Sequence, residues 1–156
     1  MSPLELKIPP PLVAAAVAGA MTAASVWLPQ VLVLPLPPSV RVGAALVLVG
    51  VGACFDVAGL LAFRKAKTTV NPLAPNRSTA VVSTGVYRIT RNPMYLGMAL
   101  ILLGLALYLA SPWALLGPLV FAAFITRFQI QPEERALTAR FGAAYTAYCT
   151  QVRRWL

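Results

Sequence analysis

Four long apolar stretches constrain the fold of this chain more than any other feature. They cover approximately residues 12–34, 42–63, 93–110 and 113–130. A hydrocarbon core about 30 Å thick is crossed by roughly 20 helical residues, so each stretch is close to the length that a spanning helix needs. Only 11% of the residues are charged, against about 25% in soluble domains. The sequence therefore predicts an all-α integral membrane protein with four transmembrane helices, a single domain over residues 1–156.

The first apolar stretch and the last connection refine this picture. The first stretch is rich in alanine and follows Lys7, a pattern that also fits a signal peptide. Its basic flank is thin and includes Glu5, so we favour a spanning helix. Only Ser111-Pro112 separates the last two stretches, which predicts a tight antiparallel helical hairpin.

The distribution of basic residues predicts the orientation in the membrane. They gather in two segments, and the opposite connections hold only Arg41. The two basic groups are Arg64, Lys65, Lys67, Arg77, Arg88 and Arg91, and Arg127, Arg135, Arg140, Arg153 and Arg154. Because cytoplasmic flanks carry the excess of Lys and Arg, we expect both termini and the connection after residue 63 to face the cytoplasm.

The net charge and the missing residue types exclude several functions. The basic residues lie beside apolar runs, without interleaved stacking aromatics, so we expect them to meet anionic lipid headgroups and not nucleic acid. The chain has no histidine, and Cys54 and Cys149 are far apart in sequence. This combination predicts no zinc, haem or thiolate metal site.

The C-terminal segment predicts an amphipathic helix over about residues 132–152. Apolar and aromatic residues recur there at spacings of three and four, so they share one helix face. They are Leu137, Phe141, Tyr145, Tyr148, Val152 and Trp155. We expect an interfacial helix that folds back against the cytoplasmic ends of the bundle. Its aromatic face fits either burial at the membrane boundary or contact with a ligand.

The motif "TRNPMYLGM", residues 90–98, opens the third apolar stretch. Asn92 is a favoured N-cap, and Pro93 suits the first position of a helix. Local structure therefore accounts for these two residues, but not for Tyr95 and Gly97 in the first turns. The connection before the motif is about 27 residues long, which is typical of a functional or disordered loop.

Three of the four acids stand at unusual places. Glu133 and Glu134 adjoin Pro132 after the fourth stretch, where they either stabilise a helix start through its dipole or bind a ligand. Asp56 lies about two turns inside the second stretch, where an unpaired charge is costly. Asp56 either pairs with Arg127, Arg64 or Lys65, or serves as the coupling carboxylate of a small four-helix transporter or channel subunit.

The ordered motifs from about residue 68 onward resemble one family. They are "TTVNPLAP", "STGVYRITRNPMYLGM", the apolar hairpin, "QPEERAL" and "RFGAAYTAYCTQVRRW". Together they resemble the small integral-membrane methyltransferases that include isoprenylcysteine carboxyl methyltransferase and phospholipid (phosphatidylethanolamine) N-methyltransferase. The first two apolar stretches resemble this family in hydropathy alone, and Val86 departs from the proline of many relatives.

The resemblance implies S-adenosylmethionine as methyl donor, held at the cytoplasmic face. Relatives carry His or Asn before the motif proline, and Asn92 leaves this chain without a histidine base. By position, the resemblance implies catalytic roles for Arg91, Asn92 and Glu134. The donor-binding residues that it implies are Tyr87, Arg91, Asn92, Pro93, Tyr95, Leu96, Gly97, Glu133 and Glu134.

The chemistry of methyl transfer is compatible with these residues. Charge disperses as a sulfonium gives up its methyl group, so placement in a dry, shaped site supplies much of the rate without metal or histidine. Arg91 is the candidate clamp for the donor carboxylate, and Gly97 would let a bulky group approach the helix closely. The acceptor is a lipophilic amine, carboxylate or thiol that enters from the bilayer. The oligomeric state is open, since Gly43 and the Gly50/Gly52 pair permit close packing within or between chains.

Overall fold

The computed structural model describes residues 4–29, 36–66, 73 and 78–156 of the chain. All regular structure in these segments is helical. Its elements are α1 (Pro10–Trp27), α2 (Pro38–Lys65), η2 (Gly85–Arg88), α3 (Pro93–Leu109), α4 (Leu116–Ile125), η3 (Thr126–Ile130), α5 (Gln131–Phe141) and α6 (Ala143–Gln151). The motif "TTVNPLAP" lies outside the described residues except for Leu73.

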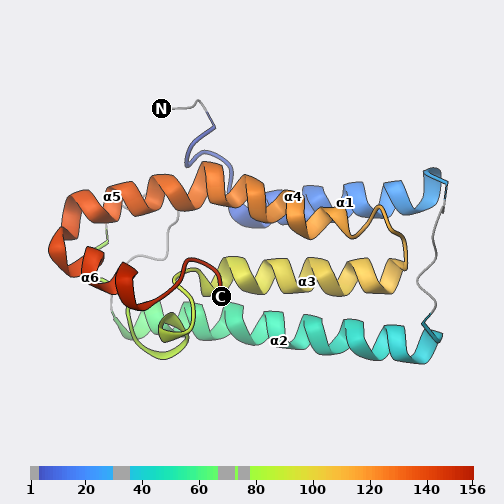
Figure 1. Ribbon diagram of the computed structural model, residues 1–156, viewed down its shortest axis with the longest axis horizontal. Helices are drawn as coiled ribbons and strands as arrows, with labels where there is room; N and C mark the ends of the chain where they lie inside the picture. The colour runs from blue at the N-terminus through green and yellow to red at the C-terminus, as the bar shows by residue number, and fades with distance from the viewer. Residues whose placement is uncertain (1–3, 30–35, 67–72, 74–77) are drawn as a thin grey trace.

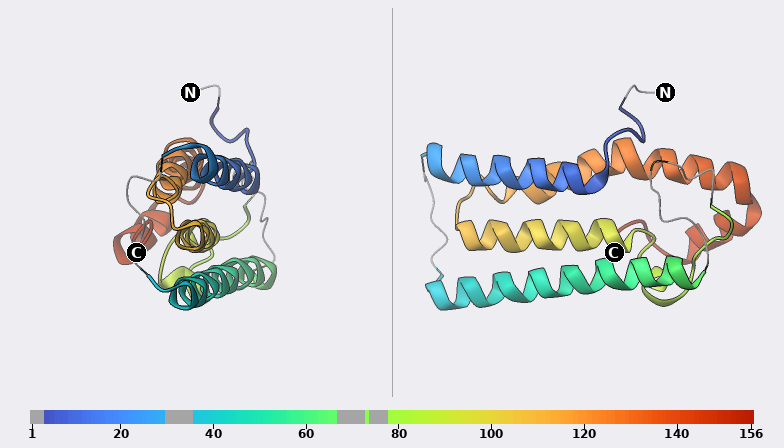
Figure 2. Two further views of the ribbon diagram at one scale, coloured as in Figure 1. Left: turned by 90° about the vertical axis from the view of Figure 1, so that its right-hand side faces the viewer. Right: turned by 180° about the vertical axis from the view of Figure 1, so that it is seen from behind.

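Helices α1 to α4 lie side by side with their axes nearly aligned (Figures 1 and 2). Helix α3 packs against α2, α1 and α4, so it is the central helix of the bundle. The beginning of α1, the end of α2, the beginning of α3 and the whole of α5 and α6 gather toward one end of the molecule (Figure 1). The predicted hairpin of the third and fourth apolar stretches is present, but residues 110–115 form its turn, which is longer than Ser111-Pro112 alone.

Two helices, α1 and α2, are long and apolar enough to cross a membrane. Helix α2 extends beyond the predicted range 42–63 at both ends, whereas α1 ends at Trp27 and residues 30–35 lie outside the description. Helix α3 is apolar but has 17 residues, and the fourth stretch contains the 10-residue α4 followed by a π-helical turn, η3. The predicted helical architecture is confirmed for the described residues, with two candidate spans.

The predicted C-terminal helix over residues 132–152 is wrong in its continuity and direction. Helices α4, η3 and α5 form one continuous rod (Figure 1), so the chain does not fold back after the fourth stretch. It turns at Gly142, whose positive φ of 51° is a backbone angle that glycine adopts at low cost. Only α6 and the residues after it return toward the bundle (Figure 1).

The described residues form two separate apolar clusters. The larger one joins α1, α3 and α4 around Met21, Leu102, Phe121 and Ile125. The smaller one lies inside the α5–α6 corner and is formed by Tyr145, Tyr148 and Val152, against which Val81, Leu137, Phe141 and Cys149 pack. Most of the predicted aromatic face of the C-terminal segment is thus buried together, but Trp155 packs against the larger cluster.

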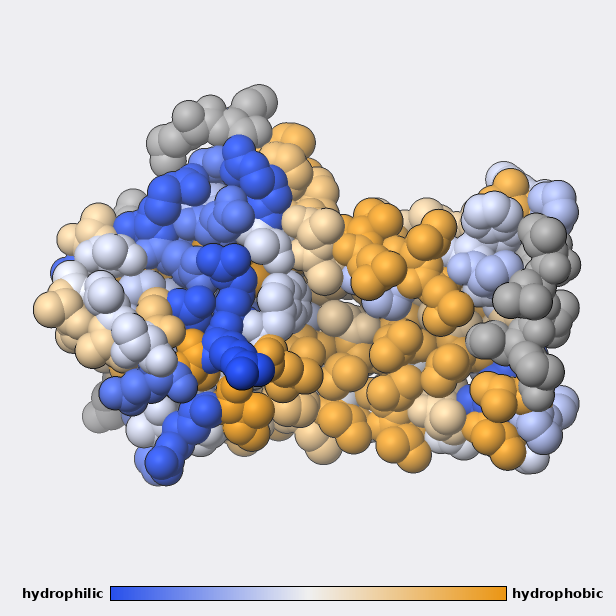
Figure 3. Space-filling model, in the orientation of Figure 1, coloured by the Kyte–Doolittle hydropathy of each residue, from blue (hydrophilic) through white to orange (hydrophobic). Residues whose placement is uncertain are grey.

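The surface divides in the same way as the core. Figure 3 shows hydrophilic residues gathered over the end that carries α5 and α6, and an apolar band over the aligned helices. On α2, one of these aligned helices, large apolar side chains such as Leu46, Val47 and Leu61 are exposed. Apolar side chains of this size face lipid favourably and water unfavourably, so the band is the part of the molecule suited to the bilayer.

Candidate functional site

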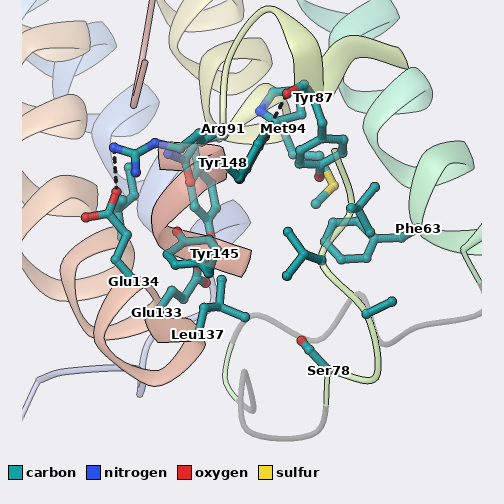
Figure 4. Close-up of a pocket in the computed structure, with 17 residues that line it drawn as sticks. Phe63, Ser78, Tyr87, Arg91, Met94, Glu133, Glu134, Leu137, Tyr145 and Tyr148 are labelled. Carbon is teal, nitrogen blue, oxygen red and sulfur yellow. Dashed lines mark hydrogen bonds and ion pairs between the residues drawn. The ribbon is translucent and has the colours of Figure 1, made fainter. Parts of the chain in front are cut away.

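A pocket opens at the polar end of the molecule. The end of α2 and the beginning of α3 lie on one side of it, and α5 and α6 lie on the other. Its apolar wall includes Phe63 and Met94, and Figure 4 shows Phe63 and Tyr87 across the pocket from Tyr145 and Leu137. The full lining consists of Phe63, Ser78, Ala80, Val81, Val82, Tyr87, Arg91, Asn92, Pro93, Met94, Tyr95, Ile130, Glu133, Glu134, Leu137, Tyr145 and Tyr148. Segments that are far apart in sequence thus meet around one cavity.

Glu134 lies between two arginines. Arg91 Nη2 is 3.1 Å from Glu134 Oε1, while Arg154 donates from Nε to Oε1 at 3.0 Å and from Nη2 to Oε2 at 2.7 Å. A two-pronged contact of this kind fixes a carboxylate in position and orientation. Arg91 Nε is buried and has no hydrogen-bond partner among the described residues, so the Arg91 guanidinium has donor capacity left.

The C-terminal tail, residues 152–156, holds the beginning of α3 in place. The carbonyl of Arg154 accepts hydrogen bonds from Thr90 Oγ1 and Asn92 Nδ2, at 3.1 and 2.9 Å. The amide of Arg91 donates to the carbonyl of Arg153 at 3.0 Å. Asn92 is the residue before α3, but its side chain makes no capping hydrogen bond. The predicted N-cap role of Asn92 is therefore wrong in mechanism, since its amide binds the tail instead.

Glu133 has neutral partners. Its Oε1 accepts hydrogen bonds from Tyr95 Oη at 2.6 Å and from Gln129 Nε2 at 2.7 Å. Burial, with a smaller contribution from the neighbouring charge of Glu134, raises the pKa of Glu133 to about 7, although the two hydrogen bonds oppose this shift. The adjacent acids thus differ, because Glu134 is paired with cations and Glu133 is held by neutral donors.

Tyrosines supply much of the remaining wall. Tyr87 packs edge-on against Phe63, with ring centroids 5.4 Å apart, and its carbonyl accepts a hydrogen bond from Tyr148 Oη at 2.7 Å. Burial raises the pKa values of Tyr87 and Tyr145 far above the ordinary value, and that of Tyr148 to about 12. These hydroxyls remain neutral, so the pocket combines aromatic faces with neutral donors and one ion-pair cluster.

The structure brings most of the predicted site residues together. Those that line the pocket are Tyr87, Arg91, Asn92, Pro93, Tyr95, Glu133 and Glu134. Leu96 and Gly97 are buried elsewhere. A Cβ at Gly97 would meet Asp56 Oδ1 and would lie 2.6 Å from the carbonyl oxygen of Gly52. The close approach expected at Gly97 therefore involves the backbone of α2 and not a ligand in this pocket.

Several lining or supporting residues were missed by sequence reasoning. Arg154 was counted only among the basic residues that predict the orientation, yet it pairs with Glu134. Gln129 lies in the π-helical turn η3, where an extra residue per turn changes which side chains face inward. No pattern in the sequence predicts such a turn. Phe63 could have been found as the last aromatic residue of the second apolar stretch, directly before Arg64 and Lys65.

Comparison with known proteins identifies the family of the chain. A model of the phospholipid methyltransferase family matches residues 40–144, which is more than half of the chain. The chain belongs to this family. It is a membrane methyltransferase by that membership, and its family acts on lipid-like substrates.

The other comparisons add little about function. An uncharacterized protein of Haemophilus influenzae is 46% identical over 63 residues, which cover its whole length and 40% of this chain. No solved structure gives a significant match. What this methyltransferase does is therefore inferred from its family and from the geometry of the pocket.

The alternative of a transporter that uses Asp56 receives no support from these comparisons. The predicted ion pairs of Asp56 are also wrong within the described residues. Arg127 pairs with Glu5 at 2.9 Å, Arg64 and Lys65 are exposed, and Asp56 Oδ1 is buried without a hydrogen-bond partner. Asp56 lies beside Gly97 on the α2–α3 contact, outside the lining of the pocket.

Proposed function

We propose that this methyltransferase uses S-adenosylmethionine and transfers its methyl group to a lipophilic acceptor at the cytoplasmic face of the membrane. The acceptor would be a lipid amine, carboxylate or thiol. The observation that carries the proposal is a single pocket that combines a charged corner at Arg91 and Glu134 with aromatic and apolar walls. A zwitterionic, nucleoside-bearing donor needs both kinds of surface.

The charged corner fits the amino-acid end of the donor. Arg91 retains a buried, unpartnered Nε and is able to bind a carboxylate. Glu134 is positioned to accept from an ammonium or a hydroxyl while the Arg154 fork keeps it in place. Asn92 stabilises this corner indirectly, through its hydrogen bond to the Arg154 carbonyl. We assign Arg91, Asn92 and Glu134 to donor binding and positioning.

The aromatic walls fit the nucleoside of the donor and the apolar part of the acceptor. Phe63, Tyr87, Tyr145 and Tyr148 offer ring faces and edges for a nucleoside base and for apolar chains. Phe63 and Met94 belong to α2 and α3, which border the apolar band of the surface. An acceptor with a long apolar part therefore has a route from the bilayer along these helices.

The reaction needs little beyond binding and placement. The bound donor supplies an electrophilic methyl group on a positively charged sulfur. The protein's contribution is to orient the acceptor toward that methyl and to exclude water, which in well-oriented systems supplies much of the barrier reduction. The buried tyrosines and the apolar wall serve this second purpose.

The proposed topology has four spans with both termini in the cytoplasm. Support comes from the aligned α1, α2, α3 and α4 (Figure 2) and from the gathering of hydrophilic residues at the polar end (Figure 3). The 17 residues of α3 reach the lower end of the spanning range. Labelling of single cysteines placed near residue 8 and residue 156 tests the proposal, since both should react only from the cytoplasmic side.

Calorimetry on detergent-purified protein tests donor use. We expect S-adenosylmethionine and its demethylated product to bind at micromolar concentrations. We also expect transfer of a labelled methyl group from the donor to a component of a membrane lipid extract. Folded protein that binds neither compound would refute the proposed function.

A further inference from the structure

The two adjacent carboxylates of the pocket differ in what neutralises them. Both oxygens of Glu134 contact arginines. Glu133 has no ion pair with any described residue, and both of its hydrogen bonds go to Oε1. Its second oxygen, Oε2, therefore has no donor within the described part of the chain, although Glu133 lines the pocket.

A buried carboxylate without a cation is costly unless it gains positive charge or a proton. Among the described residues, the groups that act on Glu133 offer it no cation, because Tyr95 and Gln129 are neutral and Glu134 is negative. Arg91, the cation in the described lining of the same pocket, is paired with Glu134. In the ligand-free protein water supplies this proton, and in the complex a ligand in the pocket supplies the charge or the proton. The hydrogen bonds on Oε1 fix the carboxylate so that Oε2 is the oxygen left to receive it.

We propose that Glu133 Oε2 takes up the proton that the methyl acceptor loses, and that the acceptor is therefore an amine or a thiol and not a carboxylate. This inference rests on the proposed function, since it requires a methyl donor in the same pocket. It narrows the acceptor by chemistry, because an ionised carboxylate has no proton to give up when it is methylated.

The step balances with the donor as the only co-reactant. The acceptor nitrogen or sulfur forms a bond to the methyl carbon while the carbon–sulfur bond of the donor breaks and its electron pair stays on the donor sulfur. The proton of the acceptor N–H or S–H passes to Glu133 Oε2, and the resulting carboxylic acid returns it to water after the products leave. Glu133 accepts the proton in this step and therefore acts as a general base.

The surroundings of Glu133 suit a base that works near neutral pH. Burial raises its pKa to about 7, Glu134 on the same helix raises it further, and Tyr95 and Gln129 lower it. A base whose pKa lies near the working pH combines a useful ionised fraction with sufficient basicity. Glu134 is unsuited to this role because both of its oxygens are already in contact with Arg91 and Arg154.

The first test separates binding from turnover in Glu133→Gln. The glutamine carbonyl retains an acceptor for Tyr95 and Gln129, so donor affinity should stay within about threefold of wild type. General base catalysis typically contributes 10²–10⁴-fold, so kcat should fall about 100-fold or more. The isosteric control Glu134→Gln should instead weaken donor binding. Turnover of Glu133→Gln within threefold of wild type would overturn the proposal, as would a tenfold loss of donor affinity at unchanged kcat.

The pH profile gives a second, independent readout. For wild type, kcat should rise with pH through about 7, because only the carboxylate form accepts the proton. Tyr95→Phe should move this limb to higher pH, since the lost hydrogen bond lowers the pKa of Glu133 in the wild type. If Glu133→Gln proves unstable, Glu133→Asp should keep a pH-dependent limb at reduced kcat. A Glu133→Asp profile that is flat across this range would contradict the proposal.

The methylated product reveals the acceptor class even while the lipid itself is unidentified. After transfer from labelled donor to membrane lipid extract, methyl esters release volatile methanol in mild alkali, whereas N-methyl and S-methyl products do not. We expect alkali-stable label. Alkali-labile label would refute the inference but leave the proposed methyltransferase intact, whereas absence of any transfer would refute both.

The ligand-free protein offers a final readout. Because the folded pKa of Glu133 exceeds its ordinary value of 4.5, its contribution to stability is present at low pH and is lost as pH rises through about 7. We expect a protonated-carboxyl band in infrared spectra that titrates near pH 7 and is missing in Glu133→Gln. A spectrum in which the two proteins titrate identically would count against the proposal.

Discussion

The α2–α3 contact and the polar end around α5, α6 and the tail are held together by different means. Where α2 and α3 meet, glycines bring the two backbones together, and a Cβ at Gly52 or Gly97 would lie 2.6 Å from the carbonyl oxygen of the other residue. At the polar end, arginines, an amide and tyrosines make directed contacts to Glu134, Glu133 and the tail.

The difference follows from the solvent that each region is suited to. Between apolar helices in lipid, burial of apolar surface gives little driving force, so close van der Waals packing through small residues stabilises the pair. At the polar end, charged groups are available and water can be excluded, so charge-assisted hydrogen bonds give both energy and position. We infer that one region is sensitive to volume and the other to the loss of single polar atoms.

The largest effect is expected from Gly97→Leu. The Cβ of any larger residue would clash with Asp56 and with the backbone of Gly52, which cannot yield as a flexible side chain would. Overpacking of this kind costs about 1–3 kcal/mol or more. We expect loss of the monodisperse peak in size-exclusion chromatography and a melting temperature at least several degrees lower.

Gly50→Leu is the matched control for volume on the same pair of helices. A Cβ at Gly50 has no atom within 4 Å, so a larger side chain has space there. This variant should purify and melt like wild type. If both variants behave alike, the α2–α3 contact is not the volume-sensitive region that the structure describes.

The next effect is expected from Glu134→Gln. The substitution removes one negative charge from between Arg91 and Arg154, and hydrogen bonds to charged groups are worth about 1.5–3 kcal/mol. In the proposed site, Glu134 accepts a hydrogen bond from the ammonium or a hydroxyl of the donor, and this charged contact would be lost. Donor affinity measured by calorimetry should therefore fall roughly 10-fold to 100-fold, with a smaller change in melting temperature.

Glu5→Gln controls for charge. Glu5 also bridges two arginines, Arg127 and Arg135, at 2.9 and 2.7 Å, but it lies outside the pocket lining. We expect this variant to change stability and to leave donor affinity unaltered. Equal losses of affinity in the two variants would show that net charge, and not the position of Glu134, matters.

A smaller loss is expected from Arg154→Ala. Arg154 holds Glu134 through two hydrogen bonds but is itself partly exposed, so solvent replaces some of the lost interaction. Donor affinity should fall by about threefold to tenfold, while Arg153→Ala, which removes an exposed side chain of the same type, should leave it unchanged. Arg154→Lys should restore little, because lysine cannot reproduce the two-pronged contact.

Sequence reasoning predicted the helical class and the third apolar element well, and the other apolar elements and the polar end only in part. Hydrophobic length placed the beginning of α3 at Pro93 and its end within one residue of Leu109, because an apolar run with a proline at its start has few alternatives. The resemblance also implied that Arg91 and Glu134 belong to one donor site, and the structure brings them together in an ion pair at 3.1 Å. These successes depend on patterns local to one element or on a hairpin that fixes which ends adjoin.

The wrong or missing predictions concern places where the helix geometry or the chain direction changes. The period of the apolar residues continues across Gly142, so residues 132–152 read as one helix even though the chain turns there. The π-helical turn at Thr126–Ile130 leaves no mark in composition. Arg154 and Asn92 meet only because the tail returns past the beginning of α3, and no local pattern specifies that return.

The smallest effect is expected from Thr126→Val, which tests the tail's outermost anchor. Thr126 Oγ1 accepts a hydrogen bond from Trp155 Nε1 at 3.1 Å, and its loss should cost about 1 kcal/mol because the indole N–H is left unpaired. We expect a melting temperature lower by a few degrees and unchanged donor affinity, since Arg154 keeps its own contacts to Glu134. Thr138→Val, an exposed hydroxyl on α5 that bonds within its own helix, serves as control. A loss of donor affinity in Thr126→Val as large as that of Arg154→Ala would mean that the tail acts as one rigid unit. The polar end would then depend on packing as a whole, as the α2–α3 contact does, and not on single polar contacts.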